Sequence, residues 1–360
     1  MTLPSGDEVW ALTKHEDIRA MLTDPRFSSN RQNPNFPLLL TGRRRITNFR
    51  ASLISMDPPE HGPARREVVG EFTVKRMAAL QPRIQQIVDE HIDAILAGPK
   101  PADLVQALSL PVPSLVICEL LGVPYADHEF FQSRSSRLLR RTTPAEERQA
   151  CVEELRGYLR DLLERKENEP GDDLLTRQLA KSDDREEVVA LGFLLLIAGH
   201  ETTANMISLG AMTLLEHPDQ LAELRADPSK TPSAVEELLR YFTIAEFATS
   251  RVAVEDVEIG GVTIHRGEGV VGLANTANRD PEVFDHADDL DLGRGARNHV
   301  AFGFGAHQCL GQNLARMELQ IVFDTLFRRI PGLRLATPVD ELPFKDDANI
   351  YGLYELPVTW

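Results

Sequence analysis

The stretch Phe302-Gly303-Phe304-Gly305-Ala306-His307-Gln308-Cys309-Leu310-Gly311 decides how the rest of this 360-residue chain is interpreted. It places Cys309 on a turn of small residues, directly before a helical pattern that begins at Gln312. A thiol at a helix N-terminus faces unpaired backbone N–H groups and the positive end of the helix dipole, and both favour the thiolate. The glycines of the stretch lack a Cβ, so the backbone can pass close to a flat or bulky group. The pattern therefore indicates a metal-binding or nucleophilic cysteine.

Plainer interpretations of the same stretch exist. A buried cysteine in a glycine-rich turn is the simplest of them. A zinc site made of His299, His307 and Cys309 would have three ligands, whereas a structural zinc site needs four. A dinucleotide fingerprint does not fit, because Gln308 stands where GxGxxG needs its third glycine, and no GK[ST] phosphate loop follows.

The pattern Phe302-Gly-x-Gly-x-His307-x-Cys309-Leu-Gly311, continued by Leu314-Ala315-Arg316, resembles the haem-binding loop of the cytochrome P450 family, the haem-thiolate monooxygenases. The resemblance implies that Cys309 is the metal ligand, the proximal thiolate of the iron in haem b (iron protoporphyrin IX). It also implies that Phe302, Gly303, His307 and Gly311 bind the cofactor. It extends over essentially the whole chain and is closest to actinomycete enzymes that oxidise macrolides, other secondary metabolites and drugs.

The fold that the resemblance implies is mainly helical with small antiparallel sheets. We expect one triangular domain, residues 1–360, around a buried haem. Residues 8–27 read as a strand and a helix, and the few tens of residues that bacterial members of the family carry before this point are expected to be trimmed or absent. The terminal residues Leu353 to Trp360 are similar to the last strand of the family.

Three more residues are expected to bind the haem. His61 and Arg65 stand at i and i+4 of a helix that follows the turn at Met56, so they share one face. Solvent contacts are the plain use of such a pair. The resemblance implies instead that His61, Arg65, His307 and Arg251 hold the haem propionates, because two carboxylates call for several cationic donors.

The segment from Asp184 to Glu216 contains no proline and predicts one long helix. Ala198-Gly199-His200-Glu201-Thr202-Thr203 interrupts its apolar centre with polar groups, which are costly inside a helix unless they have a partner or a function. A core helix with a satisfied glutamate is one interpretation. The resemblance to the oxygen-binding helix of the family implies the other: Glu201 and Thr202 pass protons to dioxygen, and Gly199 leaves room for it.

The resemblance also implies a structural network in which Glu237 and Arg240, an ExxR pair, are joined by Arg294. Between residues 243 and 272 the pattern favours strands. The apolar alternation slips at Glu255-Asp256, which predicts a bulge, and Gly260-Gly261 predicts a two-residue hairpin. By resemblance, residues 244–249 line the pocket above the haem.

Composition limits the classes of function. The chain has 55 acidic and 39 basic residues and a net charge of −16, which argues against general nucleic-acid binding. Three scattered cysteines argue against a disulfide framework and for a reducing compartment. The longest apolar run, Val188 to Gly199, is too short to span a bilayer, and no signal peptide pattern is found. We therefore expect a cytoplasmic protein without a membrane anchor, and a monomer.

The implied reaction inserts one atom of dioxygen into a C–H bond or an alkene of a small organic substrate, a secondary metabolite or xenobiotic. No flavin or iron–sulfur motif occurs, so electrons from NAD(P)H would arrive through a ferredoxin reductase and a ferredoxin. The expected docking residues for ferredoxin are basic: Arg65, Arg66, Lys75, Arg76 and Arg297.

Two other functions remain open. One is a haem-thiolate enzyme that couples phenols or dehydrogenates, although the Glu201-Thr202 pair favours ordinary oxygen activation. The other is a haem sensor without enzymatic activity, which the lack of a signalling or DNA-binding segment disfavours. In the long loop 28–55, the basic residues Arg43, Arg44, Arg45 and Arg50 form either a solvated face or a contact to an anionic or polar substrate.

Overall fold

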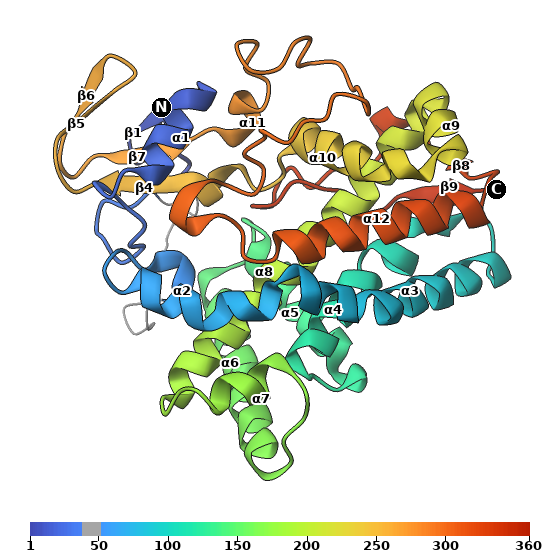
Figure 1. Ribbon diagram of the computed structural model, residues 1–360, viewed down its shortest axis with the longest axis horizontal. Helices are drawn as coiled ribbons and strands as arrows, with labels where there is room; N and C mark the ends of the chain where they lie inside the picture. Colours follow the sequence, from blue (N-terminus) through green and yellow to red (C-terminus); the bar gives the residue numbers. More distant parts are fainter. Residues whose placement is uncertain (38–51) are drawn as a thin grey trace.

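The computed structural model describes residues 1–37 and 52–360, and helices make up most of it (Figure 1). The helices are α1 (His15–Thr23), α2 (His61–Val69), α3 (Val74–Ala97), α4 (Pro111–Leu121), α5 (His128–Leu139), α6 (Ala145–Asn168), α7 (Leu174–Leu179), α8 (Arg185–Glu216), α9 (Pro218–Ala226), α10 (Thr231–Phe242), α11 (Ala274–Ala277) and α12 (Gln312–Arg329). The basic residues at 43–50, which the sequence offered as a substrate contact, lie outside the described residues.

Helix α8 runs through the middle of the molecule and confirms the long helix that the sequence predicts (Figure 1). Asp184 caps its N-terminus by accepting a hydrogen bond of 3.2 Å from the backbone N–H of Glu187. The helix ends at Glu216, because Pro218, two residues later, cannot continue its hydrogen bonds. It is long and apolar enough to cross a membrane by composition, but more than half of its most apolar stretch is buried inside the protein. It packs against α4, α6 and α12, and is a core helix.

Helices α12 and α3 lie side by side across the face shown in Figure 1 and cover α8. The buried side of α12 carries Leu319, Val322, Phe323 and Leu326, at the spacing of one helical face. Gly210 of α8 allows the close approach, because a Cβ added there would lie 2.5 Å from Cζ of Phe323. The helix that follows Cys309 is thus fixed directly onto the core.

The sheets are small, as expected, but one strand pair is parallel where only antiparallel sheets were expected. One has the strand order β1 (Val9–Leu12), β7 (Gly269–Gly272), β4 (Ser250–Ala253), β2 (Phe27–Ser28), with β1 parallel to β7 and the other pairs antiparallel. A second has the order β3 (Ala102–Asp103), β9 (Pro357–Thr359), β8 (Arg334–Leu335), all antiparallel. The third is the pair β5 (Val257–Ile259) and β6 (Val262–Ile264).

The hairpin prediction is confirmed, and the bulge prediction is wrong. Gly260 and Gly261 join β5 to β6 with φ of 58° and 77°, the left-handed region that a tight two-residue turn requires. The change of phase at Glu255-Asp256 is no bulge within a strand. It is the break between β4 and β5, which belong to different sheets.

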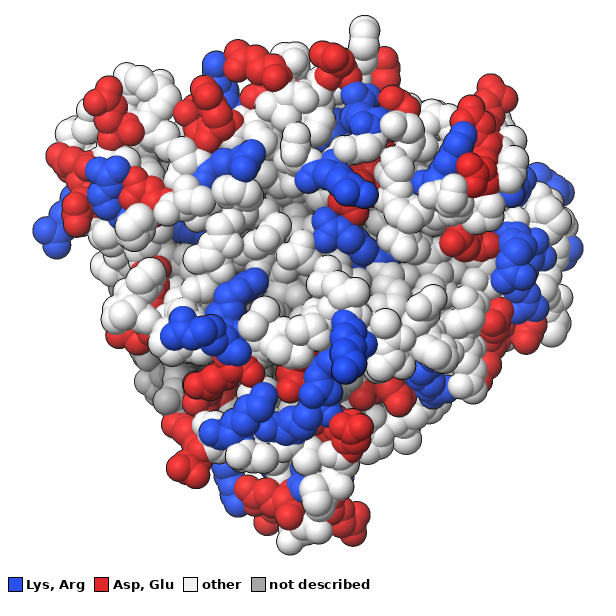
Figure 2. All heavy atoms as spheres, viewed as in Figure 1, with Lys and Arg blue, Asp and Glu red and all other residues white. Residues whose placement is uncertain are grey.

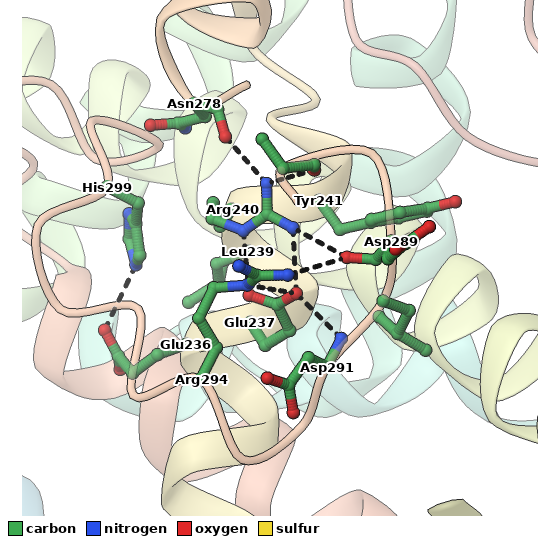
Figure 3. A network of polar contacts seen from close by, with 12 residues as sticks. Glu236, Glu237, Leu239, Arg240, Tyr241, Asn278, Asp289, Asp291, Arg294 and His299 are labelled. Atoms are coloured by element: carbon green, nitrogen blue, oxygen red, sulfur yellow. Dashed lines mark hydrogen bonds and ion pairs between the residues drawn. The ribbon is translucent and has the colours of Figure 1, made fainter. Parts of the chain in front are cut away.

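The irregular segment between α11 and α12 is held by the network that the family resemblance implies (Figure 3). Arg240, fully buried, donates to both carboxylate oxygens of Glu237 at 2.8 Å. Arg294 joins the same carboxylate at 3.1 Å. The remaining donors of the two arginines bind backbone carbonyls of the segment, at Asn278, Asp285, His286, Ala287 and Asp289. This network fixes the path of the chain toward the Cys309 stretch.

Candidate active site

Cys309 sits on a closed loop at the N-terminus of α12. Its backbone N–H donates to the carbonyl of Phe302 at 2.8 Å, which closes the loop. Gly303 turns the chain with φ of 68°, a conformation that side chains with a Cβ rarely adopt. The helix begins at Gln312, three residues after the cysteine, as the sequence predicts.

Two opposing effects act on the pKa of the Cys309 thiol, and the sequence predicts only one of them. Burial is the largest influence and raises the pKa of the Cys309 thiol above its usual value. The backbone N–H of Gly311 and the charges of Arg65 and Arg316 lower that pKa, and so does the N–H of Gln312. The helix terminus therefore favours the thiolate, as expected, but without a bound metal the effect of burial is larger and favours the neutral thiol. A metal ion would supply the remaining stabilisation of the thiolate.

The structure brings His61, Arg65, Arg251 and His307 together next to this loop. The rings of His61 and His307 lie 4.0 Å apart between centroids. Arg65 donates to the carbonyl of Gln308 at 2.5 Å. Arg251 is 6% exposed and donates to the carbonyl of Ser250 at 2.8 Å.

Positive charge is concentrated in this cluster. Burial lowers the pKa of His307 to about 3, with further contributions from His61, Arg251 and Arg65. Burial, followed by the charge of Arg31, lowers the pKa of Arg251 to about 10. Asp57 acts in the opposite direction on Arg251, but its oxygens accept from the Ser28 hydroxyl and the Ser29 N–H. The cluster is therefore built to receive additional negative charge.

On α8, Glu201 is buried and forms an ion pair that the sequence does not indicate. Lys345 donates from Nζ to Glu201 Oε1 at 2.6 Å and to Asn205 Oδ1 at 2.8 Å. The second oxygen of Glu201, Oε2, is buried without a hydrogen-bond partner and lies 3.8 Å from His200 Nε2. One oxygen of the carboxylate is thus fixed by a cation, and the other is available to a proton donor.

Thr202 is the accessible part of this polar stretch. Its hydroxyl donates to the carbonyl of Ala198 at 2.8 Å, one turn earlier. Ala198 and Thr202 both keep accessible surface, although their neighbours Leu196, His200 and Thr203 are buried. This face of α8 is therefore accessible, although much of the helix is buried.

The comparisons with known proteins agree with one another. A family model described as cytochrome P450 matches residues 124–331. Over 365 aligned residues, 100% of this chain and 90% of the relative, the chain is 54% identical to pentalenic acid synthase of Streptomyces avermitilis. The chain belongs to the cytochrome P450 family.

Two further relatives place this P450 more closely. It is 50% identical to vitamin D3 dihydroxylase of Streptomyces griseolus, over 100% of this chain and 90% of that enzyme. The crystal structure of cytochrome P450 MoxA from Nonomuraea recticatena is similar with a TM-score of 0.93 and 59% identity, over 99% of this chain and 91% of that one. The protein is a P450 monooxygenase, its fold is that of the family, and haem is its cofactor.

The residues of this P450 fit haem. Haem carries two carboxylates, and the cluster offers two arginines and two histidines, with Nε2 of His61 buried and unpartnered. A Cβ added at Gly303 or at Gly311 would meet no heavy atom within 4 Å, so a flat group can lie against either residue. Phe302 lies beside both His299 and Arg316. A zinc site fits less well, because no group of three or more metal-ligating side chains is found in residues 1–37 and 52–360.

The structure shows a packing reason for the glycine at position 199. A Cβ at this position would lie 2.8 Å from Cδ1 of Ile117 on α4. The missing side chain therefore allows α4 to pack closely on α8.

Sequence reasoning missed three residues of the site. Lys345 is a lone lysine in a segment without periodicity, and nothing near it in the sequence signals a partner. Arg316 ends the quoted pattern Leu314-Ala315-Arg316, and Glu236 directly precedes the Glu237–Arg240 pair, but neither was given a role. The adjacent acids Glu236-Glu237 were the available signal, since two carboxylates in the middle of a largely buried helix need two sets of partners.

Proposed function

We propose that this P450 hydroxylates a small, largely apolar organic molecule, with Cys309 as the iron ligand and electrons from a ferredoxin and its NAD(P)H-dependent reductase. The chain acts as one domain and one monomer, in the cytoplasm. The observation that carries the proposal is the cluster of basic side chains, short of anions, beside the Cys309 loop. When bound, the haem supplies the activation of dioxygen, and the protein supplies the ligand, the protons and the substrate position.

The apolar substrate class is supported by the segment that the family places above the haem. Residues 244–249 read Ile-Ala-Glu-Phe-Ala-Thr, with four apolar side chains. The C-terminal part of the chain holds this segment, because the backbone N–H of Tyr351 donates to the carbonyl of Ile244 at 3.1 Å. Ligand pockets lined mainly by apolar groups take apolar ligands. The names of two relatives, pentalenic acid synthase and vitamin D3 dihydroxylase, are consistent with this class.

Glu201 and Thr202 are proposed to deliver protons. Thr202 presents its hydroxyl on the accessible side of α8, and rotation away from the Ala198 carbonyl frees that hydroxyl to donate to a ligand. Glu201 keeps Oε2 free, so it can take up a proton and pass it on. Both groups sit on one rigid helix, which keeps their separation constant.

Ferredoxin is proposed to dock on the face that carries α2, α3 and α12. Figure 2 shows basic side chains over the middle of this face, with acidic side chains frequent along its upper edge. Arg66, Lys75 and Arg297 are exposed there, together with the apolar Val69 and Val74, 45% and 72% exposed. Arg65, expected at this surface, instead turns inward to Gln308. Opposite charges would guide the partner, and the valines would give it an apolar contact.

Two measurements test the proposal. Reduced protein under carbon monoxide should show the long-wavelength band of thiolate-ligated haem, and a band typical of histidine ligation in fresh protein would refute Cys309 as the ligand. Thr202→Ala should bind haem and substrate normally but form several-fold less product per NAD(P)H, with the difference released as hydrogen peroxide. Thr203→Ala is the matched control, because Thr203 also bonds back one turn, to Gly199 at 3.4 Å. Equal coupling in both variants would contradict the role of Thr202.

A further inference from the structure

Glu236 on α10 joins the two arms of the Cys309 loop. Its carboxylate accepts two hydrogen bonds from Arg316 on α12, at 2.6 and 3.0 Å. Its Oε2 also lies 3.1 Å from Nε2 of His299, which precedes the loop (Figure 3). Nδ1 of His299 accepts from the backbone N–H of Ala301 at 3.2 Å, so Nε2 carries the hydrogen that is donated to Glu236. One side chain thus holds the chain before and after Cys309.

Arg316 connects Glu236 to the cysteine electrostatically. Its guanidinium lies 4.6 Å from the centroid of the Phe302 ring, and the carbonyl of Phe302 accepts the N–H of Cys309. Arg316 also lies on the second turn of α12, whose N-terminus follows Cys309, so its positive charge stands close to the cysteine loop. Burial raises the pKa of Glu236, but hydrogen bonds from His299 and Arg316 and the charge of Arg316 outweigh burial and lower that pKa to about 2, so Glu236 is held as a carboxylate.

We propose that Glu236 is a positioning residue for Cys309 that offsets the charge of Arg316 and thereby keeps the reduction potential of the haem low. The proposal rests on Cys309 being the iron ligand, as proposed above. Glu236 is not a member of the Glu237–Arg240–Arg294 network, and its role is different. That network binds the irregular segment, whereas Glu236 binds the loop itself.

The sign of the effect follows from electrostatics. Reduction adds one electron to the haem–thiolate unit, so a positive charge nearby favours the reduced state. With Glu236 in place, the field of Arg316 at the sulfur is partly cancelled. Removing the carboxylate charge leaves that field uncompensated, and the potential should rise. Removing Arg316 instead leaves the negative charge of Glu236, and the potential should fall.

The test is spectroelectrochemical titration of the haem-loaded enzyme. Glu236→Gln should raise the potential, Arg316→Gln should lower it, and the double variant should return close to the wild type. Glu186→Gln is the matched control, because Glu186 also binds two arginines, Arg156 and Arg160, but between α6 and α8. The control should leave the potential unchanged.

A potential that does not rise in Glu236→Gln, or rises equally in the Glu186 control, overturns the inference. If Glu236→Gln loses its haem, the reduction potentials of Arg316→Gln and Arg316→Lys are compared instead. Only Arg316→Gln removes the positive charge, so equal potentials in these two variants overturn the inference. The carbon monoxide band keeps the two proposals apart. A wild type without the thiolate band refutes Cys309 ligation, whereas a normal band with unchanged potentials refutes the role of Glu236 alone.

Discussion

Replacing Lys345 by methionine should destabilise the protein strongly. Lys345 and Glu201 are 6% and 4% exposed, and the change leaves a buried carboxylate without its cation at 2.6 Å. Breaking a buried ion pair by removing one partner costs about 3–5 kcal/mol. The change also removes the hydrogen bond from Lys345 to Oδ1 of Asn205, and Nδ2 of Asn205 already has no partner. We therefore expect a loss near the upper end of that range in the free energy of unfolding of Lys345→Met, measured by urea denaturation of the haem-loaded enzyme.

A double-mutant cycle separates the charge from the packing. Glu201→Gln removes the charge that Lys345→Met leaves unpaired, so the double variant should be more stable than Lys345→Met by about 2 kcal/mol or more. Lys14→Met is the control for a surface pair, because Lys14 lies 3.4 Å from Glu282 and the two side chains are 54% and 64% exposed. It should cost little, because exposed ion pairs contribute little to stability. The reasoning is refuted if Lys345→Met costs no more than this control, or if the effects in the cycle simply add.

Three further predictions concern other parts of the molecule. Arg251→Gln should speed haem transfer to excess apomyoglobin by roughly 10- to 100-fold, because a charge-assisted hydrogen bond contributes about 1.5–3 kcal/mol, and an unchanged rate would show that the propionates point elsewhere. Gly352→Ala should lower the free energy of unfolding by about 1–3 kcal/mol, since a Cβ there would collide with Asn205. Gly157→Ala, in the open middle of α6, should instead raise it by up to about 1 kcal/mol, and the same sign for both would contradict the steric argument. The fall of the pKa of Glu236 from 4.5 to about 2 corresponds to about 3 kcal/mol. That stability is complete above pH 4.5 and is lost as the pH falls toward 2. The difference in free energy of unfolding between wild type and Glu236→Gln should therefore narrow through this window. A constant difference would contradict the lowered pKa of Glu236.

The parts of the fold that could be predicted are those with local signals. The limits of α8 follow from Asp184 as a cap and Pro218 as a stop, both adjacent to the helix that they bound. The hairpin at Gly260-Gly261 is likewise encoded by two neighbouring residues. The Glu237–Arg240 pair lies within one helical turn, and its third member came from the family pattern.

The parts that could not be predicted depend on contacts between distant segments. Lys345 and Glu201 are 144 positions apart, and no period or spacing links them. The packing of Ile117 against Gly199 depends on how two helices cross. The reversal of the pKa of Cys309 has the same origin: the helix terminus is visible in the sequence, but the depth of burial is a property of the whole fold.

The way Arg240 and Arg294 bind the irregular segment has a consequence for how freely that segment can vary. At Asp285 and Asp289 the arginines contact the carbonyl oxygen, a group that every amino acid carries, and both side chains are exposed. The network thus recognises the course of the backbone and is indifferent to the identity of these residues. Surface charge could be redesigned at both positions, for instance to change the choice of electron donor, without disturbing the support of the cysteine loop.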